Sequence, residues 1–393
     1  MPEPHVVLHV LNHMDHGGAQ DNTLATCEGL DRDRWRVVIA APAGGAQAER
    51  AARVADEVVD LVHLQRDLAP ARELPAYQEL RRVLARLRPD VVHTHGSKAG
   101  VVGRLAAAAE GVPAIVHTLH GMPVTPATAR YLRPVLLAAE RRAARRAHEV
   151  VCVCDSNLVE ARALRIVPAG QGVVVASGVD EGLFATARTE ERRTEVRRRL
   201  GLPPHAVVGV WVGRLMEQKA PLDLVAAARL ALAGNPDLHL VVVGDGELRT
   251  EVERAAAGLA RLHLLGHRDD VADLLATADL FVQSSLWEGL GRALTEACLA
   301  GLPSVATAVN GIPDLVSPGH TGLLVPAARP DLLANAVLEA TSDLDRLQAW
   351  GLAAATSVRG RFDVRAMVDG LDAVYARCLG HDDAPVRAGA GLP

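Results

Sequence analysis

The chain alternates short apolar runs with longer segments whose apolar residues recur at helical spacing. In the first half, the apolar runs cover residues 6–11, 37–41, 58–61, 91–95, 114–118, 150–153 and 173–175. Short runs rich in Val and Leu, with helical patterns between several of them, are typical of strands buried on both faces of a sheet. The alternation predicts parallel strands joined by right-handed helical crossovers.

The pattern breaks at residues 177–180 and then begins again. A charged helix is expected at 188–200, followed by strands at 207–212, 239–244, 262–266, 280–283, 304–306 and 322–325, and a last helix at 364–378. We therefore predict an N-terminal domain over 1–182 and a C-terminal domain over 183–362. A C-terminal helix over 363–380 is expected to cross back to the first domain, and residues 381–393 should form a flexible tail.

Two such series predict an α/β protein with two Rossmann-like, doubly wound domains in tandem. In open parallel sheets, ligands bind at the carboxyl ends of the strands. Two domains that face each other at those ends are expected to enclose a central cleft. The candidate chemistry should therefore lie in loops that directly follow strands.

Composition narrows the class of protein. Of the 393 residues, 49% are hydrophobic and 3% aromatic, so the cores must consist mainly of Ala, Val and Leu. The formal net charge of -5 argues against a nucleic-acid partner. The five Cys show no ligand-like grouping. Because the N-terminus lacks a basic leader and no apolar run approaches the roughly 18 residues of a membrane span, we expect a cytoplasmic protein.

Residues 286–296 carry the most specific pattern. Glu288 and Glu296 have seven residues between them, and Gly289 and Gly291 stand at the expected start of a helix. Glycine leaves the first backbone N–H groups of a helix without a side-chain cap, so a ligand's oxygen atoms can take that place. The alternative is that glycine is merely a tolerated cap and that both glutamates are solvated.

Two glycine-bearing loops are candidates for binding phosphate. Gly213, Arg214 and Lys219 follow the strand at 207–212, and the two cations together suit a diphosphate. An exposed basic loop is the alternative. Gly17 and Gly18 lie between the first strand and a helix, where backbone amides can approach an anion closely. They do not have the glycine spacing of a dinucleotide-binding fingerprint.

Histidines follow two other strands. His120 lies just after the strand at 114–118 and can hydrogen-bond a sugar hydroxyl or a phosphate. His95 and Lys98 lie at the end of the strand at 91–95, beside a helix start where an anionic acceptor can rest. A structural histidine with satisfied hydrogen bonds is the alternative. Because no carboxylate is spaced with these histidines like a metal ligand set, we expect no metal site.

Residues 131–146 read as a helix in which arginines alternate with apolar residues. Such a face can lie on anionic lipid headgroups near a lipid-linked substrate. The alternative is a solvated helix whose arginine stems cover their neighbours.

Together these motifs resemble one family, the retaining GT-B glycosyltransferases of family GT4, which use nucleotide-diphosphate sugars. The resemblance covers nearly the whole chain. It rests on residues 17–20, 93–100, 117–121, 213–219, 288–296 and 310–314, which occur in the family's order. It implies the GT-B fold, with an acceptor domain in the first half and a donor domain in the second.

The resemblance also implies roles for individual residues. Glu288 supports charge at the donor sugar, and Glu296 anchors the ribose. Arg214 and Lys219 stabilise the departing diphosphate, and His120 contacts the donor sugar. The other implied donor-binding positions are Gly17, Gly18, Gly213, Gly289, Leu290, Gly291 and Arg292, and the candidate acceptor-binding positions are His95 and Lys98. No metal or other cofactor is expected, because basic side chains and a helix N-terminus replace the metal.

The predicted function is retaining transfer of a hexose or N-acetylhexosamine to a cell-envelope glycan or a lipid-linked acceptor. A UDP-sugar is favoured over a GDP-sugar as the donor. Peripheral contact with the inner face of an anionic membrane is expected, and nucleic acid is not. The alternatives are a nucleotide-sugar epimerase or a phosphorylase on the same fold, and a non-catalytic nucleotide-sugar-binding protein.

Overall fold

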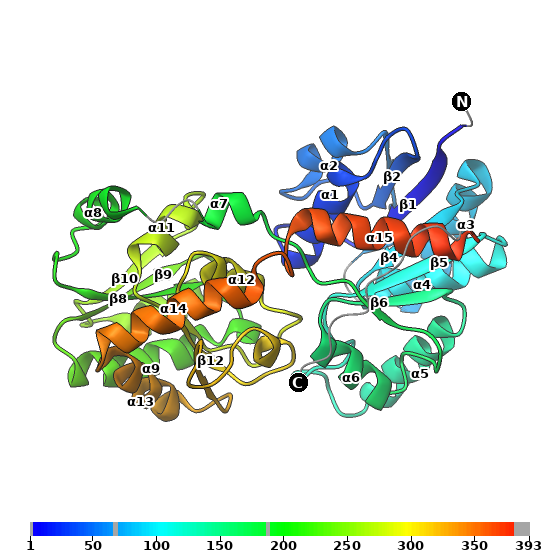
Figure 1. The fold of residues 1–393 in the computed structure, drawn as a ribbon. Coiled ribbons are helices and arrows are strands. Elements are labelled where there is room, and N and C mark those ends of the chain that lie inside the picture. Colours follow the sequence, from blue (N-terminus) through cyan, green and yellow to red (C-terminus); the bar gives the residue numbers. More distant parts are fainter. Residues whose placement is uncertain (1–2, 66–69, 186–188, 381–393) are drawn as a thin grey trace. The chain divides into compact units, whose positions relative to one another are not determined.

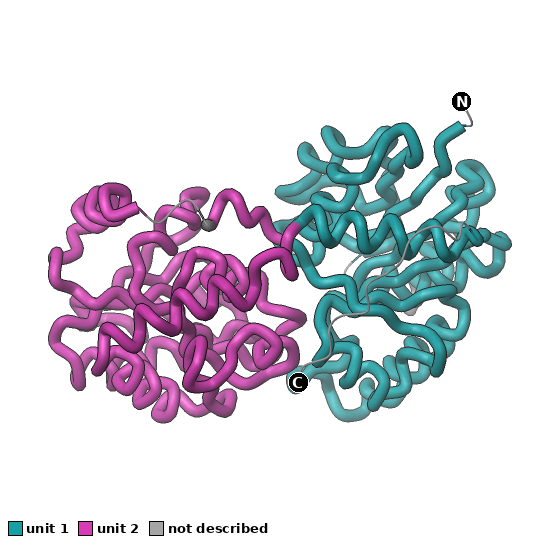
Figure 2. The backbone as a smooth tube through the Cα atoms, in the orientation of Figure 1, with its two compact units in different colours: residues 1–178, 364–393 teal, residues 179–363 magenta. Residues whose placement is uncertain are grey.

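The computed structural model describes residues 3–65, 70–185 and 189–380. The chain divides into two compact units, unit 1 with residues 1–178 and 364–393, and unit 2 with residues 179–363 (Figure 2). The predicted domain boundary follows residue 182, whereas the units divide after Gly178. The tail predicted over 381–393 lies outside the described residues.

Unit 1 is built on a seven-stranded parallel sheet with the order β3-β2-β1-β4-β5-β6-β7 (Figure 1). Its strands are β1 (His5–Val10), β2 (Trp35–Ala41), β3 (Glu57–Asp60), β4 (Val91–His95), β5 (Ala114–Leu119), β6 (Glu149–Cys152) and β7 (Val173–Val174). Its helices in the described residues are α1 (Gly18–Gly29), α2 (Ala48–Val54), α3 (Pro70–Leu87), α4 (Ser97–Ala109), α5 (Arg133–Ala144), α6 (Asp155–Ala163) and α15 (Val364–Cys378). The strand order reverses at β1, as in doubly wound folds.

Unit 2 repeats this plan with a six-stranded parallel sheet in the order β10-β9-β8-β11-β12-β13. Its strands are β8 (Val207–Val212), β9 (Leu238–Val243), β10 (Leu262–Gly266), β11 (Leu280–Gln283), β12 (Ser304–Thr307) and β13 (Gly322–Val325). Its described helices are α7 (Glu181–Ala185), α8 (Glu190–Arg199), α9 (Pro221–Gly234), α10 (Arg249–Ala256), α11 (Val271–Thr277), α12 (Arg292–Leu299), α13 (Pro330–Thr341) and α14 (Leu344–Val358), with short 3-10 turns η1 (Glu217–Lys219) and η2 (Ile312–Asp314).

The core of unit 1 lies on both faces of its sheet. Val7 of β1 packs in the cluster that contains Val368 and Leu371 of α15. The next residue, Leu8, packs in a second cluster with Leu80 of α3. Because successive side chains of a strand point to opposite faces, helices must cover both, which is why the strands read as continuous apolar runs.

The last helix, α15, packs into unit 1 against α1 although it follows unit 2 in the sequence (Figure 1). The indole Nε1 of Trp35 donates to Oδ1 of Asp372 on α15 at 2.6 Å. Tyr375 is fully buried, and its hydroxyl lies 2.6 Å from Nδ1 of His93 in β4. This helix is therefore part of the core beneath the carboxyl ends of β1 and β4.

Both sheets confirm the predicted α/β class and the parallel strands. The predicted strands at 91–95, 207–212, 262–266, 280–283 and 322–325 match the observed ones residue for residue, and the others differ by one or two residues at one or both ends. Within the described residues, no helix combines the length and apolar character that crossing a bilayer requires.

Candidate functional site

Glu288 lies at the centre of a buried polar cluster at the carboxyl edge of the unit 2 sheet. It sits in the loop after β11 and is 6% exposed. Its Oε1 accepts from Lys219 Nζ at 2.5 Å, from Gln283 Nε2 at 2.8 Å and from Ser285 Oγ at 2.7 Å. Its Oε2 has a longer contact of 3.5 Å with Gln218 Nε2. The carboxylate is therefore held through one oxygen, and the solvated alternative for Glu288 is wrong.

Neighbouring loops fix the backbone around Glu288. The backbone N–H of Glu288 donates to Asn310 Oδ1 at 2.9 Å, and the hydroxyl of Thr307 donates to the carbonyl of Ser285 at 2.6 Å. On the other side, the N–H of Leu286 donates to the carbonyl of Gln218 at 2.8 Å. The loops after β8, β11 and β12 thus form one hydrogen-bonded unit, which orients the carboxylate before any ligand binds.

The loop after β8 carries the two predicted cations. A Cβ on Gly244, which has a φ of +133°, would lie 1.8 Å from the carbonyl oxygen of Gly213, so only glycine lets these two loops meet. The N–H of Leu215 then donates to the carbonyl of Asp245 at 2.9 Å. Lys219 ends in the ion pair with Glu288, whereas Arg214 is exposed. The structure places Lys219 in contact with Glu288 and places Arg214 on the same loop.

The start of α12 lacks a side-chain cap, as the sequence predicted. Gly291 precedes the helix with a φ of 95° in the left-handed region, where glycine is favoured. Arg292 Nε donates to Glu296 Oε1 at 2.9 Å, and Glu296 is 9% exposed. The buried Nη1 of Arg292 has no hydrogen-bond partner among the described residues. This helix start combines backbone amides with a guanidinium group, a suitable environment for phosphate oxygens.

The first-unit glycines also stand at a helix start. Gly17 precedes α1, which begins at Gly18 and has no side-chain cap. A Cβ on Gly17 would lie 2.6 Å from Oε1 of Gln20, so a larger residue there would require the Gln20 side chain to move. The free amides there remain a predicted anion-binding feature.

His120 and His95 form part of a histidine cluster at the carboxyl edge of the unit 1 sheet. Nδ1 of His95 lies 3.0 Å from Nε2 of His120, and Nε2 of His95 lies 3.0 Å from Nδ1 of His9. His95 is 3% exposed, whereas His120 is half-buried. Lys98 is also buried and contacts Glu73 at 2.9 Å. With both ring nitrogens engaged, His95 is better placed to orient His120 than to contact an acceptor.

One ring nitrogen from each of His9, His93 and His95 lies within 4.8 Å of the others, a spacing that can hold a metal ion. Both nitrogens of His93 are already hydrogen-bonded, to Tyr375 at 2.6 Å and to Thr118 at 2.7 Å. A metal ion would have to displace one of these partners. This grouping was not predicted from the sequence, because the prediction relied on a carboxylate in the ligand set and His9 was not among the candidate residues.

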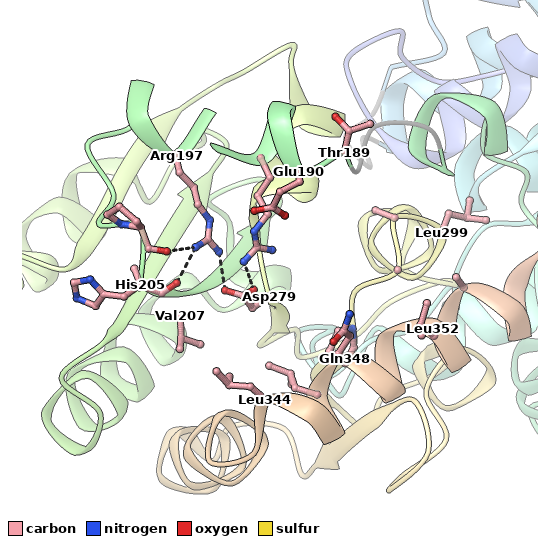
Figure 3. A pocket seen from close by; sticks show the side chains of 18 of the residues that line it. Thr189, Glu190, Arg197, His205, Val207, Asp279, Leu299, Leu344, Gln348 and Leu352 are labelled. Atoms are coloured by element: carbon pink, nitrogen blue, oxygen red, sulfur yellow. Dashed lines mark hydrogen bonds and ion pairs between the residues drawn. The ribbon is translucent and has the colours of Figure 1, made fainter. Parts of the chain in front are cut away.

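A pocket of about 670 Å³ lies elsewhere in unit 2 (Figure 3). Val207, at the start of β8, and Asp279, just before β11, line it, so it lies at the amino ends of the strands. Arg193 and Arg197 of α8 contact Asp279 at 2.6 and 2.8 Å. These arginines hold α8 to the sheet, and the opposite edge is the stronger candidate for chemistry.

Comparisons with known proteins identify the family. Residues 16–183 match the model described as Glycosyltransferase Family 4, and residues 206–343 match that described as Glycosyl transferases group 1. The UDP-Gal:alpha-D-GlcNAc-diphosphoundecaprenol alpha-1,3-galactosyltransferase of Escherichia coli is 34% identical over 294 residues, covering 71% of this chain and 73% of that protein. The chain belongs to the family 4 glycosyltransferases. A D-inositol 3-phosphate glycosyltransferase of Thermobispora bispora is 33% identical to it over 326 residues, covering 77% and 74% of the two chains.

Solved structures show the fold of this glycosyltransferase. Anabaena HepE in complex with UDP and glucose has a TM-score of 0.81 at 22% identity, covering 95% of this chain and 100% of that one. Sucrose-phosphate synthase from Thermosynechococcus elongatus has a TM-score of 0.80 at 21% identity, with coverage of 96% and 99%. At these identities the likeness concerns the fold alone, which is GT-B as predicted.

The residues that hold Glu288 in this glycosyltransferase were not predicted from the sequence. Gln283 and Ser285 follow directly from the apolar run of β11, and a buried polar residue at the end of such a strand was an available signal. Asn310 contributes to the family resemblance but was given no role of its own. Its φ of 41° and its contact with the N–H of Glu288 show what it does.

Proposed function

We propose that this glycosyltransferase transfers a sugar from a UDP-sugar to a lipid-linked acceptor with retention at the anomeric carbon. The supporting observation is the 34% identity to the Escherichia coli enzyme, whose name gives UDP-Gal as the donor and a GlcNAc-diphosphoundecaprenol as the acceptor. That match covers 71% of this chain, which is enough to include residues of both units.

Unit 2 supplies the groups that bind and activate the donor. Arg214 and Lys219 neutralise the diphosphate as it leaves, and the first amides of α12 donate to its oxygens. The unpartnered Nη1 of Arg292 supports this role for the same helix start. Glu296 accepts hydrogen bonds from the ribose hydroxyls. The hydrogen bond that its carboxylate accepts from Arg292 Nε keeps the carboxylate in one orientation for this role.

Glu288 acts on the sugar. Its Oε1 is saturated by three donors, so Oε2 is the oxygen that remains to face a substrate. The C–O bond between the anomeric carbon and UDP breaks, and its electron pair leaves with the phosphate. The acceptor's oxygen attacks from the same face and passes its proton to that phosphate. A fixed carboxylate beside the oxocarbenium-like centre and fixed cations beside the phosphate both lower this barrier.

Groups of unit 1 complete the proposed mechanism. The amides at Gly17 and Gly18 assist the diphosphate, and His120 donates to an oxygen of the transferred sugar. No metal is required in this mechanism, because the cations of unit 2 and the helix N-termini carry the charge compensation that a metal otherwise supplies.

The donor is tested by thermal shift and by product release. We expect UDP to raise the melting temperature more than GDP or ADP does, since a ligand at 100 times its Kd stabilises by about 2.7 kcal/mol. With UDP-Gal, UDP-Glc or UDP-GlcNAc and a GlcNAc-diphospholipid, at least one donor should release UDP, and NMR of the product should show the retained anomer. A sugar altered without an acceptor identifies an epimerase instead, and the absence of any response to UDP contradicts the proposal.

We also propose that α5 contacts an anionic membrane, where a lipid-linked acceptor resides. Tyr131 and Val135 are 76% and 63% exposed. Arg142, seven residues after Val135, lies on the same side of α5, and Arg145 and Arg146 follow directly after its end; all three are exposed. Exposed apolar side chains beside cations are the composition of a surface that binds anionic headgroups.

Reversing the charge of Arg142, Arg145 and Arg146 to Glu should abolish co-sedimentation with vesicles that contain phosphatidylglycerol. Each basic residue contributes about 1 kcal/mol near such a surface, so the triple change should weaken partitioning by more than 100-fold. The matched control is the same reversal at Arg192, Arg198 and Arg199 of α8, which are exposed cations without exposed apolar neighbours in that helix. Equal loss in both variants, or binding to neutral vesicles alone, contradicts the assignment.

A further inference from the structure

A line of three histidines runs from the interior of unit 1 to its carboxyl edge. His9 of β1 and His95 of β4 are buried, and His120, just after β5, is the partly exposed end. Nδ1 of His9 lies 3.0 Å from Nε2 of His95, and Nδ1 of His95 lies 3.0 Å from Nε2 of His120. The rings of His9 and His95 are stacked, with an angle of 11° between their planes. The three side chains therefore form a continuous hydrogen-bonded chain.

Each histidine of this chain carries one ring proton near neutral pH. Burial lowers the pKa of His9 to about 3 and that of His120 to about 4. Burial, together with the neighbouring imidazoles, places the pKa of His95 well below its ordinary value. A neutral imidazole has one donor nitrogen and one acceptor nitrogen. His95 must therefore accept from one neighbour and donate to the other, which allows only two arrangements of the protons.

The unpartnered nitrogen of His9 distinguishes these two arrangements. Nε2 of His9 is buried and has no hydrogen-bond partner among the described residues. If His120 donated to His95, and His95 to Nδ1 of His9, the single ring proton of His9 would have to sit on Nε2. That N–H would then be a buried donor without an acceptor. In the reverse arrangement it carries only a lone pair. Orphaned buried N–H groups are rarer than underused acceptors, so the reverse arrangement is favoured.

We propose that His9 and His95 are positioning residues that fix His120 as the neutral tautomer with its proton on Nδ1. In this arrangement His9 donates to His95, His95 donates to Nε2 of His120, and Nδ1–H of His120 donates to an oxygen of the sugar substrate. The inference rests on the proposed function for the last step alone, since the tautomer follows from contacts within unit 1.

The tautomer is measured directly in the wild-type protein by ¹⁵N-detected NMR of the histidine rings at pH 7.5. We expect His120 to show a protonated Nδ1 and a bare Nε2. A protonated Nε2, or a cationic ring, overturns the proposal whether or not the protein transfers sugar. Shifts of the His9 or His95 nitrogens upon treatment with EDTA also overturn it, because they show that these nitrogens bind a metal.

Two substitutions test the link to activity. His9→Leu removes the first donor of the chain without touching substrate, so a fraction of His120 should convert to the other tautomer. We expect kcat to fall by about fivefold, the effect of one neutral hydrogen bond, with the KM for the UDP-sugar unchanged. His120→Asn places an amide donor near the position of Nδ1 and should keep more activity than His120→Gln, whose donor lies near that of Nε2.

The matched control is His263→Leu in unit 2. His239 Nδ1 and His263 Nε2 lie 3.0 Å apart in a similarly stacked pair. Loss of the hydrogen bond between His239 and His263 should leave both kcat and the ¹⁵N NMR spectrum of His120 unchanged. The proposal is contradicted if His9→Leu and His263→Leu change kcat equally. It is also contradicted if the His120→Gln variant keeps more activity than the His120→Asn variant. If the wild type releases no UDP with any donor, the proposed function fails, but the NMR result still decides the tautomer.

Discussion

Replacing Glu288 by Gln should lower the rate of UDP release by roughly 10²–10³-fold and leave the protein folded, since the loss of one fixed electrostatic group at a reacting centre typically has this effect. Gln retains an oxygen to accept from Lys219, Gln283 and Ser285, so the cluster keeps its hydrogen bonds. What disappears is the negative charge beside the sugar. The KM for the UDP-sugar should change little, because the diphosphate contacts lie on other residues. Initial rates of UDP release over a range of donor concentrations measure both parameters.

Glu288→Ala should behave differently from Glu288→Gln. It leaves the ammonium of Lys219 and two other donors without their common acceptor in a buried site, which destabilises by about 1–3 kcal/mol or more. Glu217→Gln is the matched control, because it removes a charge from an exposed side chain two residues before Lys219. Its turnover and melting temperature should stay at the wild-type values. A Glu288→Gln enzyme with nearly wild-type turnover contradicts the role assigned to this carboxylate.

The strands were predictable because of where they lie. In a parallel sheet covered by helices on both faces, every strand position is apolar, so runs such as 91–95 and 207–212 are visible without any knowledge of their neighbours. Helices α13 and α14 were not named in advance. Gly351 lies inside α14, where it weakens a helical pattern, and a Cβ there would lie 2.2 Å from the carbonyl oxygen of Gly301. A tertiary contact therefore requires glycine at position 351, and the local sequence does not reveal that contact.

In the candidate site too, features that depend on local sequence were predictable and features that depend on tertiary contacts were not. The glycine start of α12 and the two glutamates were visible because they depend on local order in the chain. The contacts that orient Glu288 come from loops far apart in sequence, such as that between Lys219 and Glu288. His95 shows the limit most clearly. Its position at the end of a strand suggested an open site, but its side chain points to the face that α15 covers, where His9 and His93 already lie.

Mild acid should destabilise unit 1 because of its buried histidines. Burial lowers the pKa of His9 to about 3 and of His120 to about 4, and it holds the pKa values of His93, His95 and His117 well below the ordinary value. In the unfolded chain each imidazole binds a proton below about pH 6.5. The stabilisation is thus fully present above that pH and is lost as the pH falls toward the lowered pKa values, by up to about 1.4 kcal/mol per pH unit for each histidine.

Between pH 7 and pH 5.5, unit 1 should therefore lose roughly 3–6 kcal/mol of unfolding free energy, a large part of the 5–15 kcal/mol of a typical domain. Trp35 is the only tryptophan in residues 1–178 and 364–393. Its fluorescence in a variant with Trp211, Trp287 and Trp350 replaced by Phe follows urea unfolding of unit 1 alone. The control is the Trp35→Phe variant, in which the fluorescence comes only from the tryptophans of unit 2 and therefore follows the unfolding of that unit. In unit 2 the pKa is lowered for only two described histidines, His239 and His263, so its midpoint should move much less. Equal shifts of the two midpoints would show that carboxylates common to both units, rather than the histidine cluster, govern acid stability.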